Sequence, residues 1–175
     1  MSSSTENVKL GVCTVTFDGV DLGLTKGGVE VEVSTMTHEV TVDQFGETPV
    51  GEIITGRMVT ANVPLAETTL DNLVKIMPGA TLLTEGTGPA TKKRVIVPVS
   101  TSLNLLTVAK KLVLRPYNTT GEDDFVIPLA MCPGAMNFTY QLDQERIFTA
   151  RFKGYVGSNG MLFSVGDESV VIPNS

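Results

Sequence analysis

Residues that commonly carry catalysis are sparse in this sequence. It has a single histidine, His38, which follows a threonine-rich stretch and precedes Glu39. A Ser-His-Asp triad would have to use His38, and no G-x-S-x-G elbow is present to hold the serine. The P-loop, dinucleotide-binding and H-E-x-x-H patterns are also missing. Because a lone histidine is more often a surface or packing residue, we expect no catalytic residues and no enzymatic activity.

The spacing of possible metal ligands is equally unpromising. Cys13 and Cys132 lie far apart in apolar, strand-like runs. This predicts buried free thiols, which suit a reducing compartment, and neither a disulfide framework nor a metal site. The run Glu122-Asp123-Asp124 lacks the spacing of a calcium loop. We therefore expect no metal and no cofactor.

The charge is concentrated near the N-terminus. The 175 residues have a formal net charge of −6, and residues 1–60 account for all of it, with nine acidic and three basic side chains. Residues 61–175 hold ten of each sign. This distribution argues against a module that grips nucleic-acid phosphates, which needs clustered lysine and arginine. Two interpretations stay open, a solvated acidic face or a surface that repels a polyanion.

The main basic cluster is Lys92-Lys93-Arg94 together with Lys110-Lys111. It is either a solvated face or a contact with acidic groups of a neighbouring subunit, because charge complementarity sets the register between protomers. The sequence has no tryptophan and few aromatic residues. A stacking platform for bases or sugars is therefore not expected.

An acidic ribbon over residues 29–65 dominates the predicted architecture. Valines and acidic residues alternate with a period of two over residues 29–34 and again over Glu39–Asp43, which predicts strands with one apolar face. Gln44–Glu52 interrupts the pattern with two glycines and a proline, and Ile53–Leu65 resumes it as a long strand. The valines at 29, 31, 40 and 42 are expected to face the core.

One helix is predicted over residues 68–77. Thr68 can serve as its N-cap, with Asp71 as a capping-box partner. Pro78-Gly79 ends it. A single apolar stripe is expected on its surface, formed by Leu70, Leu73, Val74 and Met77.

The remaining sequence predicts strands over 9–18, 92–99, the second half of 103–114, and 125–131, with a loop over 80–89. Alternation predicts a hairpin of residues 135–142 with 147–156, whose outer face is uncharged or basic. The fold class is thus mainly β, an antiparallel sandwich or partial barrel flanked by one helix. Residues 1–8 are expected to form an N-terminal arm, 9–157 the domain and 158–175 a C-terminal arm. No secretion signal or membrane helix is expected.

The segment from Gly28 to Ala80 resembles the major tail tube proteins of long-tailed, non-contractile bacteriophages. The resemblance lies in the order of VEVEVST, THEVTVDQFGETPVGEIITG, MVTANVPLAE and the helix TTLDNLVKIMPGA. It implies a virion protein, assembled in the host cytoplasm, whose hexameric rings stack into a tube. Strands of neighbouring subunits would join into one barrel, with genome DNA passing through its lumen without tight binding. The implied partners are further copies of the chain, a tape-measure protein, and tail terminator and tail-tip proteins.

This interpretation assigns roles to individual residues. By strand alternation, the acidic lumen candidates are Glu30, Glu32, Glu39 and Asp43. Weaker polar candidates are Thr41, Thr60, Asn62, Asn137, Thr139 and Gln141. The expected inter-subunit loop comprises Gln44, Phe45, Gly46, Glu47, Thr48, Pro49, Val50, Gly51 and Glu52. The alternative is a monomeric or dimeric β-sandwich that acts as a binding or decoration module.

Overall fold

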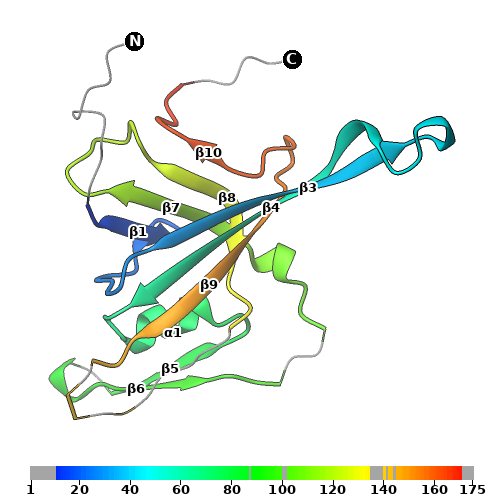
Figure 1. Ribbon diagram of the computed structural model, residues 1–175. Coiled ribbons are helices and arrows are strands. Elements are labelled where there is room, and N and C mark those ends of the chain that lie inside the picture. The colour runs from blue at the N-terminus through cyan, green and yellow to red at the C-terminus, as the bar shows by residue number, and fades with distance from the viewer. Residues whose placement is uncertain are drawn as a thin grey trace.

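The protein folds into antiparallel sheets flanked by one helix (Figure 1). The computed structural model describes residues 11–86, 88–99, 102–134, 140, 142–143 and 145–170. The main sheet has eight strands in the order β2-β1-β7-β8-β9-β4-β3, with β10 paired to β8, and a second sheet contains β5 and β6. The predicted fold class is confirmed.

The strands of the main sheet are β1 (Cys13–Phe17), β2 (Val20–Asp21), β3 (Glu30–Thr41), β4 (Pro49–Leu65), β7 (Lys110–Pro116), β8 (Phe125–Met131), β9 (Phe148–Tyr155) and β10 (Ser164–Val165). The small sheet consists of β5 (Thr81–Glu85) and β6 (Lys92–Ile96). The helix is α1 (Leu70–Ile76), and short 3-10 turns occupy Asp43–Phe45, Gly88–Ala90 and Leu105–Val108.

The main sheet bends at β9, which connects a layer of β1, β7 and β8 to a layer of β3, β4 and β9 (Figure 1). Residues 148–153 of β9 pair with β4, and residues 153–155 pair with β8. Gly154 lies at this corner. A Cβ at Gly154 would lie 2.3 Å from Cγ1 of Val59 on β4 and 2.9 Å from Cγ2 of Ile127 on β8. The missing side chain therefore allows the two layers to approach closely.

The core lies between the two layers. Phe17 of β1 and Phe152 of β9 meet there, with ring centroids 5.1 Å apart. Burying one large apolar side chain contributes about 1.5–3 kcal/mol, so these contacts hold the layers together. The alternation predicted for β4 and β9 is confirmed by the buried residues Val59, Ala61, Val63, Leu65, Phe148, Ala150 and Phe152. On β3 only Val31 packs against the core, and Val33 is already 42% exposed.

The N-cap of the helix lies one residue later than predicted. It is Thr69, whose hydroxyl oxygen accepts a hydrogen bond from the Asn72 N–H at 3.2 Å. Such a cap contributes about 1 kcal/mol. The assignment of the N-cap to Thr68 is therefore wrong, and α1 is shorter than the expected 68–77.

Two other helix predictions are also corrected. Asp71 is not the capping-box partner, because the residue three positions after the N-cap Thr69 is Asn72. Its carboxylate accepts a hydrogen bond from Nζ of Lys93 on β6 at 2.7 Å. This hydrogen bond lowers the pKa of the Asp71 carboxyl. The apolar stripe is rotated relative to the prediction, since Ile76 is the buried residue and Leu70 is exposed. Leu73 and Met77 pack against the core as expected.

Two other segments differ from the predictions, and two more lie wholly or mostly outside the described residues. The region 80–89, predicted as loop, contains β5, which pairs with β6. The predicted C-terminal arm contributes β10, which pairs with β8, and Phe163 stacks on Phe125 with ring centroids 5.2 Å apart. The predicted strand over 135–142 lies mostly outside the described residues, and β9 pairs with β4 and β8. The predicted N-terminal arm also lies outside them.

We expect Gly154→Ala to lower the free energy of unfolding by about 1–3 kcal/mol, because the new methyl group overpacks the bend between β4 and β8. Urea denaturation followed by circular dichroism measures this change. The matched control is Gly51→Ala in β4, where a Cβ meets no heavy atom within 4 Å. Its effect should stay within about 0.5 kcal/mol. Equal midpoints for the two variants would contradict this account of the bend.

Candidate assembly surfaces

Strands β3, β4 and β9 present a polar face on the side away from the core. Because side chains alternate along β4, Thr60 and Asn62 lie on the other face of the strand from the buried Ala61 and Val63. The cross-strand register then forms two rows on this face, Glu30–Asn62–Arg151 and Glu32–Thr60–Lys153. Nδ2 of Asn62 donates to Oε2 of Glu30 at 3.1 Å. These six residues are called the outer face below.

The structure thus brings together four of the predicted lumen residues: Glu30, Glu32, Thr60 and Asn62. It adds Arg151 and Lys153, which the lumen prediction missed. The basic outer side of β9 was visible as alternation in the sequence, but nothing local indicated that β9 lies next to β4. Two carboxylates and two cations therefore share the outer face, which carries no net charge.

The other acidic and polar candidates do not join this face. β3 is one continuous strand, so the odd-numbered Glu39 and Thr41 lie on the opposite side of the ribbon from Glu30. Treating Glu39–Asp43 as a separate strand is therefore wrong, and Asp43 itself lies in a 3-10 turn. The remaining candidates lie outside the described residues: Asn137, Thr139 and Gln141.

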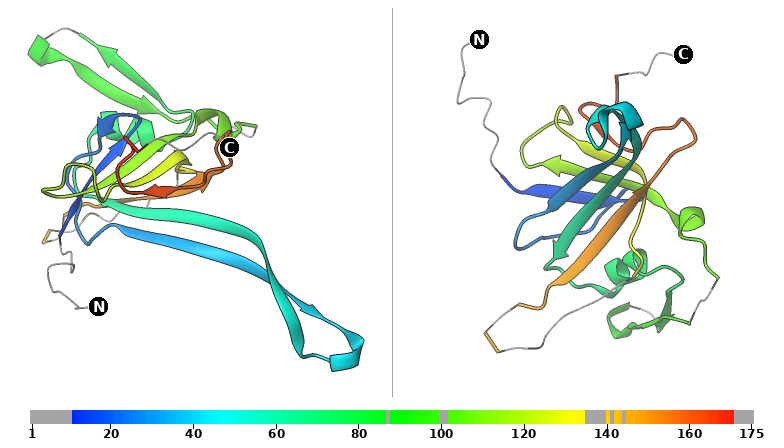
Figure 2. Two further views of the ribbon diagram at one scale, coloured as in Figure 1. Left: turned by 90° about the horizontal axis from the view of Figure 1, so that it is seen from above. Right: turned by 45° about the vertical axis from the view of Figure 1, so that its right-hand side comes forward.

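Residues 34–58 form a hairpin arm that projects from the two layers (Figures 1 and 2). β4 pairs with β9 only over residues 60–65, so within the described residues the arm's part of β4 pairs with β3 alone. None of residues 34–58 is buried. Thr55 is an extra residue in β4 that forms a bulge, and its hydroxyl donates to the Met36 carbonyl at 3.1 Å. Such a bulge bends the strand and increases its twist.

The arm exposes both apolar and acidic side chains. Six of its large apolar residues are each 42–65% exposed: Met36, Phe45, Val50, Ile53, Ile54 and Met58. Val40 and Val42 also lie in the arm, so the expectation that they reach the core is wrong. Four carboxylates, Glu39, Asp43, Glu47 and Glu52, against the single Arg57 give the arm a net charge of −3. An apolar patch bordered by charged residues is typical of an interaction site.

The predicted inter-subunit loop forms the end of this arm. Gln44 and Phe45 belong to the 3-10 turn, and Gly46, Glu47 and Thr48 complete the connection. The other four residues, Pro49, Val50, Gly51 and Glu52, are strand residues of β4. The loop is therefore shorter than predicted, because the alternating pattern conceals a strand that contains Pro49 and Gly51.

One cross-strand pair in the arm is electrostatically unfavourable. Glu39 and Glu52 are direct partners in the β3–β4 ladder. Like charges at such positions destabilise a sheet. Both residues are exposed, and neither forms an ion pair within the part of the chain that the structure describes.

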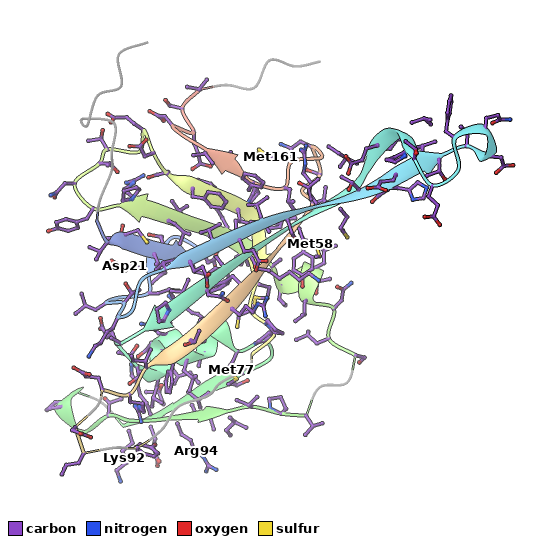
Figure 3. All side chains as sticks on the ribbon, in the orientation of Figure 1. Asp21, Met58, Met77, Lys92, Arg94 and Met161 are labelled. Carbon is purple, nitrogen blue, oxygen red and sulfur yellow. The ribbon has the colours of Figure 1, made fainter. Side chains whose placement is uncertain are left out.

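The small sheet offers a second exposed surface. α1 covers one of its faces, where Leu82 and Val95 are half-buried. On the opposite face lie Leu83 and Ile96, which are 48% and 40% exposed. Lys92 and Arg94 share this face by strand alternation, and Figure 3 labels them on β6. A groove of about 520 Å³ includes Leu83, Lys92 and Arg94 among its lining residues.

The predicted basic cluster is divided between the two sheets. Lys110 and Lys111 belong to β7 of the main sheet, whereas Lys92, Lys93 and Arg94 belong to β6. Lys111 pairs with Glu168 at 2.5 Å, and Lys110 lies 4.0 Å from Asp18. Only the cations of β6 therefore border the exposed apolar residues of the small sheet.

The structure also places the residues that were considered as catalytic or metal-binding candidates. His38 is exposed in the arm. Cys132 is buried and Cys13 is half-buried, both as free thiols, and burial raises the pKa of the Cys13 thiol. Asp124 is only 3% exposed and accepts hydrogen bonds from the Arg115 guanidinium, the shortest at 2.6 Å. This ion pair accounts for the burial of Asp124 at the end of the acidic run.

Among the described residues, no three side chains of the ligating types are grouped closely enough to hold a metal ion. A helix with the length and apolar character to cross a membrane is likewise not found there.

We expect the amide hydrogens of residues 34–58 to exchange with solvent faster than those of residues 60–65 in the isolated subunit. β4 runs through both regions, so its residues 60–65 serve as an internal control for its residues in the arm. Local opening needs less free energy where a ribbon has few buried contacts and one hydrogen-bonded neighbour. Hydrogen–deuterium exchange with mass spectrometry measures both regions, and equal protection in the isolated subunit would contradict this expectation.

Comparison with known proteins does not place the chain in a family. No protein-family model matches it, and no curated protein matches its sequence. The case for a function therefore rests on the outer face, the arm and the small sheet.

Proposed function

We propose that the protein is a structural subunit of a bacteriophage tail tube. Subunits form hexameric rings, the rings stack into a tube, and genome DNA passes through the lumen during ejection. The observation that carries this proposal is the hairpin arm. It extends from a well-packed domain, and the arm itself exposes six large apolar side chains. The resemblance of residues 28–80 to tail tube proteins supports the same function.

The arm has the properties of a self-assembly element. A long exposed ribbon with apolar side chains is an aggregation hazard for a free monomer. A neighbouring subunit that covers the ribbon removes this hazard and adds hydrophobic burial. No buried residue anchors the arm within its own subunit. The arm is therefore better suited to contact another chain than to stabilise its own domain.

The open edges of the main sheet support assembly of a shared barrel. β3 and β2 are the terminal strands of the hydrogen-bonded order. Joining β3 to a strand of the next subunit would continue the layer of β9, β4 and β3 around a closed wall, and closure removes unpaired edges. In this arrangement the outer face lines the lumen.

The outer face suits a channel through which DNA slides. Affinity for DNA rises with every phosphate that a cation neutralises. In the two rows of the outer face, Arg151 and Lys153 are matched in number by Glu30 and Glu32. A lumen without excess positive charge holds DNA weakly. The further partners in this proposal are a tape-measure protein and the tail terminator and tip proteins, all within the virion tail.

We expect deletion of Gln44–Glu52 to leave a folded monomer that does not polymerise. The deletion joins Asp43 to Ile53 and retains the pairs from Glu30–Asn62 to His38–Ile53. Negative-stain electron microscopy and sedimentation compare it with the wild type, which should form hollow tubes or rings. Tubes from the deletion variant would contradict the role of the arm. A small monodisperse wild-type species at high concentration would instead favour a binding or decoration module.

We expect Glu30→Lys combined with Glu32→Lys to leave tubes assembled but to slow DNA ejection from phage particles. The variant places four cations in the two rows of the outer face, so phosphates gain attractive contacts. Ejection rates, measured at several salt concentrations, should differ most at low salt. Glu30→Gln with Glu32→Gln is the control that removes the carboxylates without adding cations, and it should slow ejection less. Wild-type ejection by the lysine variant would rule out a lumen position for this face.

A further inference from the structure

We propose that the arm of one subunit docks on the exposed face of the small sheet of a second copy of this chain. Glu39 and Glu52 of the arm then meet Lys92 and Arg94 of the neighbour. The inference rests on the proposed tube function and extends it, because it identifies the surface that receives the arm.

The arm brings an apolar side chain and two carboxylates to one side of the ribbon. The register pairs Ile54 with Thr37 and Glu52 with Glu39, so these four residues share a face. Ile54 is 54% exposed. The like-charge pair is unfavourable in the free subunit, and cations from a partner would convert it into a favourable contact. A basic surface on a neighbouring subunit would therefore account for the presence of the Glu39–Glu52 pair in the arm.

The small sheet provides the complementary chemistry. Leu83 pairs directly with Arg94, and Ile96 and Lys92 lie two residues to either side of Arg94 on the same face. Glu85 pairs with Lys92 and also lies on this face, so two cations and one carboxylate leave it a net charge of +1. The distance between the two cations of the small sheet is also similar to the distance between the two carboxylates of the arm. Residues two apart on a strand are separated by about 6.6 Å, and directly opposite residues of a ladder have Cβ atoms about 5 Å apart. Flexible lysine and arginine side chains readily span the difference.

Among the described residues, none covers either surface within its own subunit. A two-stranded ribbon is at best marginally stable without a further strand or a packing partner. The arm is such a ribbon, and within the part of the chain that the structure describes α1 packs on one face of the small sheet. Within the described residues, Lys92 and Arg94 form no ion pair. Docking would therefore complete two incomplete surfaces at once.

The positions of the two surfaces predict a head-to-tail contact. The arm and the small sheet extend in different directions on opposite sides of the main sheet (Figure 2). A contact between different surfaces of identical subunits is heterologous, so each subunit can donate its arm and also receive one. Such contacts propagate into a closed ring or an open helical filament.

A charge exchange tests the contact. The arm variant carries Glu39→Lys with Glu52→Lys, and the receiving variant carries Lys92→Glu with Arg94→Glu. Alone, each variant presents like charges at the contact, and we expect self-association to weaken at least about 100-fold. In an equimolar mixture every arm meets a surface of opposite charge. Association should then recover to within about tenfold of wild type, measured by analytical ultracentrifugation and electron microscopy.

A matched control separates this contact from a general charge effect. Lys110→Glu with Lys111→Glu makes the same change in net charge on β7 and should self-associate like the wild type. Mixed with the arm variant, it should give no more assembly than it gives alone, because it offers no acidic β6 surface to receive the lysine-bearing arm. Circular dichroism checks that all variants are folded.

The outcomes distinguish the docking proposal from the tube proposal. Normal assembly of either variant alone, or failure of the folded variants to complement, overturns the docking proposal, and wild-type tubes would leave the tube proposal standing. Complementation that yields assemblies without a hollow tube supports docking and overturns the tube. A wild-type protein that stays monomeric at high concentration overturns both.

Discussion

The backbone hydrogen bonds of β4 are the constraint on which the rest of the structure depends. This strand has 17 residues, yet β9 pairs with it only over residues 60–65. Beyond that point, the only neighbour among the described residues is β3. One part of β4 is therefore a central core strand, and the other is half of a two-stranded ribbon. The bend at Gly154 makes the first part possible, because it brings β8 and β4 together around β9.

Local sequence patterns predicted the elements that local chemistry determines. Alternation identified the buried face of β4, and the bounds of β8 agreed with the predicted 125–131. The small sheet was harder to predict, because β5 carries a mixed sequence whose strand conformation depends on pairing with β6. The predicted N-cap was wrong by one residue, because Thr68 and Thr69 are neighbours and each has a hydroxyl that can cap a helix. In the structure the Thr68 hydroxyl accepts a hydrogen bond from Arg146 at 2.8 Å, while the Thr69 hydroxyl caps the helix and Ile76 is its buried residue.

The outer face was predictable only in part, because some of its residues are brought there by pairing between strands that are distant in sequence. Glu30, Glu32, Thr60 and Asn62 followed from alternation within two strands that are neighbours in sequence. Glu39 was misplaced because the polar stretch before it resembles a break, whereas β3 continues through it without interruption. Arg151 and Lys153 were missed because their place depends on a pairing between β4 and β9, which lie far apart in sequence. Long-range register is decided by packing of the whole core and leaves little local signal.

In the proposed assembly, the two kinds of side chain on the arm would have different physical roles. An exposed ion pair contributes about 0–1 kcal/mol and weakens with salt. Burying a large apolar side chain contributes about 1.5–3 kcal/mol, and the arm exposes six of them. Most of the association energy must therefore come from the apolar residues. The carboxylates then select which surface is contacted and in which register, because an apolar ribbon alone would bind neighbours without a fixed orientation. The proposed docking would need the acidic arm and the face with Lys92 and Arg94 on opposite sides of the subunit, and the described fold places them there, with Glu85 as one carboxylate on the receiving face.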